Sequence, residues 1–143
     1  MKTLVIDANI VLSQAFELPY SEQAAEFLQA SRRDQDRLVV PALWWYEIIS
    51  GLRRAVTLGI LTREQALEAL DQFALIRLEA MPPSLELNRL ALEWAERIAQ
   101  SKAYDAQYLA LAEHFQAEFW TADERLVNSL KQVGITWTHR IGE

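Results

Sequence analysis

The chain has 143 residues, of which 51% are hydrophobic, and this is enough to build the core of one domain spanning residues 1–143. It contains no cysteine, which excludes disulfides, zinc–thiolate sites and cysteine nucleophiles. The net charge of -6 argues against a nonspecific nucleic-acid binder, although a cation bound by several of the acids would change the balance locally.

The first half of the chain alternates short apolar runs with helical patterns. In chain order we expect a strand at 2–6, helices at 8–16 and 21–33, a strand at 37–40 and a helix at 41–58. Pro41 is expected to stop the second strand and to open the helix that follows, which Gly59 ends.

The second half continues this alternation. In chain order we expect a helix at 62–76, a strand at 76–80, helices at 84–100 and 103–116, a strand at 118–121, a helix at 123–132 and a strand at 135–139. Thr62 and Gln65 have the spacing of a capping box, and Ser84 is a suitable N-cap. Strands that alternate with helices predict an α/β fold with a mainly parallel sheet and helices on its faces.

Two acidic residues near the start of the chain lie in apolar surroundings. Asp7 follows the first strand, and ligands of parallel sheets bind beyond the carboxyl ends of the strands, although an N-cap is the simple alternative role. Glu47 lies within LWWYEIISGL and is expected to be buried, where a carboxylate needs a partner. The structural alternative for Glu47 is an ion pair with Arg54.

Two further acidic residues lie in the second half of the chain. Asp105 is in the first turn of an apolar helix, where the helix dipole favours a negative charge. Asp123 follows the strand at 118–121. Thr121 and Glu124 fit a capping box that would free Asp123 for another role, while Asp123 as the cap itself stays open.

Four carboxylates that converge repel one another unless a cation neutralises them. Ligand sets made only of oxygen select hard cations such as Mg²⁺ or Mn²⁺. Sites of this kind position a water molecule and stabilise charge on a phosphoryl group. The four acids together therefore predict a metal-dependent hydrolase.

The segments VIDANIVL, PALWWYEIISGLRRA, AYDAQYLALAE and FWTADERL resemble the four acidic motifs of PIN-domain ribonucleases, and most of all those of VapC-type toxins from toxin–antitoxin pairs. The motifs occur in the right order between residues 3 and 137 and imply a PIN-like three-layer α/β/α domain. The resemblance carries metal binding and catalysis onto Asp7, Glu47, Asp105 and Asp123, with supporting roles for Asn9 and Thr121. Ser50 departs from the pattern, because many members have Asn there, and the departure concerns the fine positioning of metal or substrate and not the metal site itself.

The resemblance also implies partners and a reaction. The protein is expected to be an endoribonuclease that hydrolyses RNA with water activated by Mg²⁺ or Mn²⁺, to form a homodimer and to be inhibited by a cognate antitoxin. Arg53 and Arg54 are the first candidates for RNA binding, ahead of Arg32, Arg33 and Lys102. His114 and His139 are expected to be surface or packing residues.

The location and the competing functions complete the prediction. Asp7 interrupts the N-terminal apolar run and no stretch is long enough for a bilayer, so we expect a cytoplasmic protein with no membrane contact.

A haloacid-dehalogenase-like phosphatase needs an acid where Asn9 stands, and a receiver domain needs an acidic pair at the first strand. A PIN-like module with a dead site would lack one of the four acids. A PIN nuclease in RNA processing outside toxin–antitoxin systems is the main alternative, and an adjacent antitoxin gene would distinguish the two.

Overall fold

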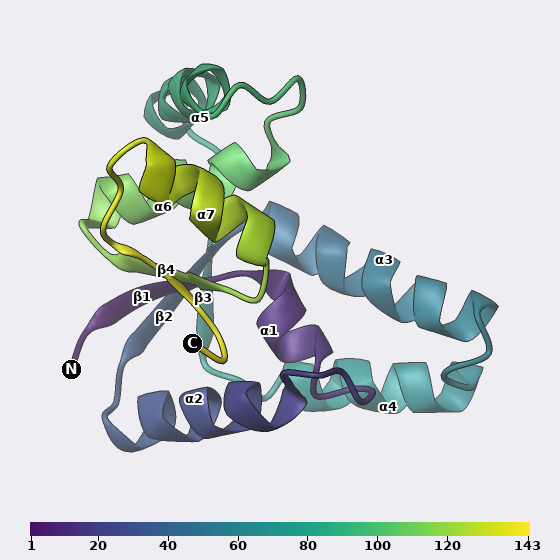
Figure 1. Ribbon diagram of the computed structural model, residues 1–143. Helices are drawn as coiled ribbons and strands as arrows, with labels where there is room; N and C mark the ends of the chain where they lie inside the picture. The colour runs from purple at the N-terminus through teal and green to yellow at the C-terminus, as the bar shows by residue number, and fades with distance from the viewer.

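A single parallel sheet forms the centre of the computed structural model, which describes residues 1–143 (Figure 1). Its strands are β1 (Thr3–Ile6), β2 (Arg37–Pro41), β3 (Leu78–Met81), β4 (Glu118–Thr121) and β5 (Thr138–Arg140). Their order across the sheet is β3-β2-β1-β4-β5, and every neighbouring pair is parallel. The predicted α/β fold with a parallel sheet is confirmed.

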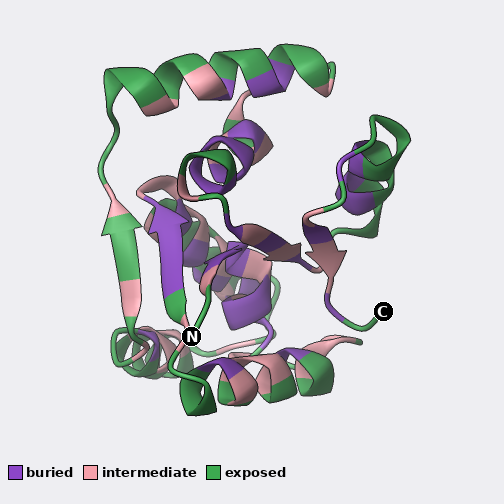
Figure 2. Cartoon of the chain, turned by 90° about the vertical axis from the view of Figure 1, so that its left-hand side faces the viewer, coloured by how far each residue is buried: buried purple, intermediate pink, exposed green.

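Helices cover both faces of this sheet. They are α1 (Ala8–Leu12), α2 (Ser21–Arg33), α3 (Leu43–Thr57), α4 (Arg63–Phe73), α5 (Leu85–Arg97), α6 (Tyr104–Phe115) and α7 (Glu124–Gln132). Helix α6 lies directly on one face with α5 outside it, α2 covers the opposite face, and α3 and α4 form a hairpin at one side (Figures 1 and 2). The arrangement is the three-layer α/β/α architecture that the sequence predicted.

The hydrophobic core lies between the central strands and the helices that flank them. Strands β1 and β2 are buried along almost their whole length, as expected for strands covered on both faces (Figure 2). Helix α6 is buried from Tyr108 to Ala112 because α5 covers the side that faces away from the sheet. This sandwiched position explains why its sequence is apolar almost all round. No helix of the structure is both long and apolar enough to cross a bilayer.

Two predicted boundaries near β2 and β3 are wrong. Pro41 pairs with Met81 as the last residue of β2, and α3 begins only at Leu43, so the proline does not open the helix. Proline is tolerated here because it stands at the end of the strand. Strand β3 starts two residues later than predicted, since the Ile76 N–H still donates to the Phe73 carbonyl in the turn after α4. As an edge strand, β3 is also largely exposed.

Two other boundaries differ from the prediction because local hydrogen bonds close the ends of helices α1 and α7. Helix α1 stops at Leu12 rather than at residue 16. Directly after this end, the Ser13 hydroxyl donates to the Ile10 carbonyl at 2.6 Å. Strand β5 begins at Thr138 rather than at residue 135. The Ile135 N–H instead donates to the Leu130 carbonyl at 3.0 Å and closes the end of α7.

Candidate active site at the carboxyl ends of β1 and β4

The topology singles out one place for a ligand. The chain leaves β1 towards β2 and β3 on one side and returns to β4 on the other, so the strand order switches at the β1–β4 pair. Ligands of open parallel sheets bind beyond the carboxyl ends of the strands at such a point. Asp7 follows β1 directly, and Thr121 ends β4.

Asp7 is the most buried of the predicted acids, with 8% of its surface exposed. It occupies the N-cap position of α1, but its side chain makes no capping hydrogen bond. Its Oδ2 atom instead accepts a hydrogen bond of 2.8 Å from the Thr121 hydroxyl and a longer one of 3.4 Å from the Asn9 amide. The capping role considered for Asp7 is therefore wrong, because its carboxylate accepts hydrogen bonds from Thr121 and Asn9 and no capping bond from the backbone of the helix.

Thr121 and Asn9 join the two strand ends around this carboxylate. The Asn9 amide nitrogen donates to the Thr121 hydroxyl oxygen at 3.2 Å, and the Asn9 amide oxygen accepts from the Ala122 N–H at 3.2 Å. The Thr121 side chain is fully buried. These bonds fix the position of Asp7 relative to β4.

Burial and neighbouring charges both act on Asp7. Burial raises its pKa to about 7 from an ordinary value of 3.8, the Thr121 hydrogen bond opposes this, and the charges of Glu47 and Asp105 raise it further. Three of the four predicted acids therefore share one electrostatic environment. The neighbouring charges with the largest effect on Asp7 are those of Glu47 and Asp105.

Glu47 on α3 is half-buried rather than fully buried, which corrects the prediction from its apolar neighbours. Its Oε1 atom accepts a hydrogen bond from the hydroxyl of Tyr108 on α6, and no ion pair with Arg54 is present. Burial raises the pKa of Glu47, the Tyr108 bond opposes this, and the charge of Asp105 raises it further. The ion-pair alternative for Glu47 is therefore wrong.

Asp105 stands in the first turn of α6 and is also half-buried. Its Oδ2 atom accepts a hydrogen bond of 3.0 Å from the side-chain amide of Gln100. Asp105 and Glu47 line an open cavity of about 560 Å³, together with Tyr104 and the segment 99–102. Lys102 is the only positively charged residue in this lining.

Asp123 has a different position from the one preferred in the sequence. It is the N-cap of α7, and its Oδ1 atom accepts from the Leu126 N–H at 3.1 Å. The predicted capping box of Thr121 and Glu124 is wrong, because β4 extends through Thr121 and its hydroxyl donates to Asp7. Asp123 is exposed, and its backbone N–H donates to the Thr121 hydroxyl oxygen at 3.1 Å.

The remaining predicted residues lie away from the cavity. Arg53 and Arg54 are exposed on α3 and do not line it. His114 contacts Glu86 at 3.3 Å, and His139 contacts Glu118 at 2.9 Å and stacks on Trp120. The expectation that both histidines are surface or packing residues is confirmed.

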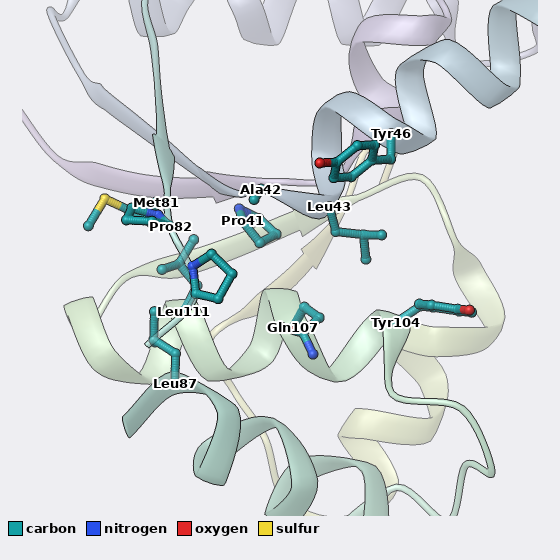
Figure 3. A pocket seen from close by; sticks show the side chains of 11 residues that line it. Pro41, Ala42, Leu43, Tyr46, Met81, Pro82, Leu87, Tyr104, Gln107 and Leu111 are labelled. Carbon is teal, nitrogen blue, oxygen red and sulfur yellow. The ribbon is translucent and has the colours of Figure 1, made fainter. Parts of the chain in front are cut away.

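An apolar pocket of about 250 Å³ adjoins the acidic cavity (Figure 3). The end of β2, the start of α3, the segment after β3 and one side of α6 form its walls. Tyr104 lines both spaces. Tyr46 and Tyr104 are 71% and 58% exposed, and each directly precedes a predicted site acid in the chain.

The donor chemistry fits a hard divalent cation, since the converging side chains offer only oxygen and two neighbouring charges raise the pKa of a third acid. The geometry is more open than a closed set of ligands. No three acidic or histidine side chains are close enough together to hold one metal ion. Metal binding by three of these residues therefore requires at least one of the carboxylates to move closer to the others.

Comparison with known families decides the identity of the domain. A family model described as PIN domain matches residues 4–131. The chain belongs to the PIN-domain family. Among curated proteins, no sequence matches this chain significantly.

Solved structures share the fold of this PIN domain at low sequence identity. A chain of the VapBC2 structure from Rickettsia felis, bound to a DNA fragment from its promoter, matches with a TM-score of 0.69 and 15% identity over 96% of this chain and 98% of its own. A toxin–antitoxin complex from Klebsiella pneumoniae gives a TM-score of 0.68 and 17% identity over 98% of each chain. PAE2754 from Pyrobaculum aerophilum gives 0.64 and 20% over 89% and 78%.

Two residues that hold acids of the candidate site were not identified from the sequence. Tyr108 stands three residues after Asp105, a spacing that places both on one face of α6, so its hydroxyl could have been assigned to the site. Gln100 gave no such signal. Its contact with Asp105 depends on the turn between α5 and α6, which periodicity does not describe.

Proposed function

We propose that this PIN domain is a divalent-metal-dependent endoribonuclease and the toxin of a type II toxin–antitoxin pair. The observation that carries the proposal is the buried carboxylate of Asp7 at the strand switch point, held by Thr121 and facing the charges of Glu47 and Asp105. A structural carboxylate in this position would be expected to have a cationic partner, and Asp7 has none.

The residues of the site divide into ligands and supports. Asp7, Glu47 and Asp105 would hold Mg²⁺ or Mn²⁺, and Asp123 would add its second carboxylate oxygen while the first caps α7. A bound ion would supply activation of the attacking water and neutralise charge on the scissile phosphate. Thr121 and Asn9 orient Asp7, and Tyr108 orients Glu47.

The surroundings of the acids suit a single-stranded nucleic acid. Exposed aromatic rings provide stacking surfaces for unpaired bases, and Tyr104 lines the acidic cavity while Tyr46 lines the apolar pocket beside it. Lys102 is placed to pair with a phosphate beside the carboxylates. Arg53 and Arg54 remain candidates for contacts with the RNA further from the acidic cavity.

Lys102→Glu is expected to weaken RNA binding about tenfold at low salt and to reduce the salt dependence of binding, because one phosphate contact is lost and one repulsive charge is added. Binding of a catalytically inactive protein to single-stranded RNA over a range of salt concentrations would measure both effects. Lys131→Glu is the matched control, since Lys131 on α7 pairs with Glu143 outside the cavity. Equal losses in both variants would show that only the overall charge matters.

The toxin role rests on similarity of fold to chains of toxin–antitoxin complexes, together with the sequence motifs. With that role we propose a cognate antitoxin partner, a homodimeric assembly and action in the cytoplasm. A role in RNA processing outside toxin–antitoxin systems is the competing proposal. Growth arrest on expression, relieved by the product of an adjacent small gene, would favour the toxin role.

The nuclease proposal is tested with purified protein and cellular RNA. Cleavage is expected with Mg²⁺ or Mn²⁺ and not with EDTA. The Asp105→Ala protein should fold normally and lose this cleavage. Sequencing of the cut ends would then define the target. Full cleavage by the Asp105→Ala protein would reject the proposed site.

A further inference from the structure

We propose that Gln100 is a positioning residue that holds the carboxylate of Asp105 in the orientation that metal binding needs. The Gln100 side-chain amide lies 3.0 Å from Asp105 Oδ2. An ionised carboxylate only accepts hydrogen bonds, so the amide nitrogen of Gln100 must be the atom that faces it. The metal-binding part of this proposal rests on the function proposed above.

The backbone places Gln100 through the turn that ends α5. Ala99 has a φ of 56°, in the left-handed region, and its N–H donates to the Glu96 carbonyl at 3.0 Å. The Gln100 N–H donates to the Ala95 carbonyl at 2.9 Å. These two bonds make a Schellman motif, which fixes the direction in which the chain leaves the helix.

The residues in this turn depart from the usual preference. Glycine is preferred at the left-handed position, and an apolar residue commonly follows it and packs back on the helix. Helix α3 ends with Gly59 and Ile60 and α7 with Gly134 and Ile135, whereas α2 and α6 have Gln35 and Gln116 at the left-handed position. At α5 the same positions hold Ala99, whose Cβ disfavours a positive φ, and the polar Gln100.

Gln100 makes a side-chain hydrogen bond that the apolar residues at the equivalent positions, Ile60 and Ile135, cannot make. Gln100 makes the only side-chain hydrogen bond to Asp105, and both residues line the acidic cavity with Glu47. The charges of Glu47 and Asp105 repel, so an Asp105 side chain without this bond would be free to turn away from Glu47. Departures from local preference that serve a site are expected where function constrains the sequence.

Gln100→Met tests the role directly, because methionine has a similar length and cannot donate a hydrogen bond. Titration calorimetry with Mn²⁺ is expected to show about 10- to 100-fold weaker binding than in the wild type, the usual loss when a group behind a metal ligand is removed. Gln116→Met is the matched control. Gln116 follows α6 at its far end in a left-handed turn, is exposed and makes no side-chain hydrogen bond.

The metal-free protein provides a second readout by NMR. The side-chain amide of Gln100 is expected to be ordered, and in the Asp105→Ala protein to become as mobile as that of Gln116. Equal Mn²⁺ affinity in the wild type and Gln100→Met would overturn the positioning role and leave the metal site intact. If the wild type binds no Mn²⁺, the proposed function fails, and the NMR mobility of the Gln100 side-chain amide is then the test of its contact with Asp105. A mobile Gln100 amide in the wild type would overturn the contact itself.

Discussion

Asp7→Asn is expected to lower the rate of RNA cleavage by about a thousandfold or more, because the site loses a charged ligand and with it several kcal/mol of charge stabilisation. The same change should stabilise the metal-free protein. Asp7 is buried without a cationic partner, whereas asparagine can still accept the Thr121 hydrogen bond without a buried charge. Activity and stability are therefore expected to move in opposite directions.

Cleavage kinetics and thermal unfolding of the same protein preparations measure these two effects. Asp71→Asn is the matched control, since Asp71 is exposed on α4 and makes no side-chain hydrogen bond. It should change neither quantity appreciably. A large loss of stability in Asp7→Asn would mean that Asp7 has a structural role, and the assignment of its carboxylate to the site would then be wrong.

The stability of the metal-free protein is expected to decrease with pH through Asp7. The pKa of this group is about 7 in the folded state against about 3.8 when unfolded, so between these values the folded state holds a proton that the unfolded state has released. The unfolding free energy therefore falls as pH rises through this window, and above pH 7 the full cost of about 4 kcal/mol is present.

The comparison with Asp7→Asn isolates this effect from other titrating groups. Chemical denaturation at pH 5 and pH 8 should show that the advantage of the asparagine variant is about 2–3 kcal/mol larger at pH 8. Millimolar Mn²⁺ should reduce this difference by stabilising the folded wild type through binding. An advantage that is the same at both pH values would mean that Asp7 titrates normally.

The sequence predicted three acids that lie near one another in the structure, but it did not predict how deeply each of them is buried. Apolar neighbours predicted that Glu47 is buried, yet Asp7 is the most buried acid, and Glu47 and Asp105 line an open cavity. Periodicity identifies the face of a helix. It does not give the depth of a residue near the point where two helices separate.

The errors at β4 and at the start of α7 have one cause. Whether Thr121 or Asp123 caps α7 depends on where β4 ends, and only the pairing of β4 with β1 and β5 determines this. The alternation of strands and helices was sufficient for the parallel sheet and its layers, because connections between parallel strands require a crossover helix. The contact of Gln100 with Asp105 depends on a turn that no such pattern describes.

The most direct test of the account is the anomalous diffraction of Mn²⁺ in crystals of the wild-type protein. A metal peak is expected between the carboxylates of Asp7, Glu47 and Asp105, at about 2.1 Å from the oxygens that bind it. The peak should be absent in crystals of Asp105→Ala treated in the same way. Crystals of the wild type that bind Mn²⁺ only elsewhere on the surface would contradict the proposed metal site and the nuclease mechanism that depends on it.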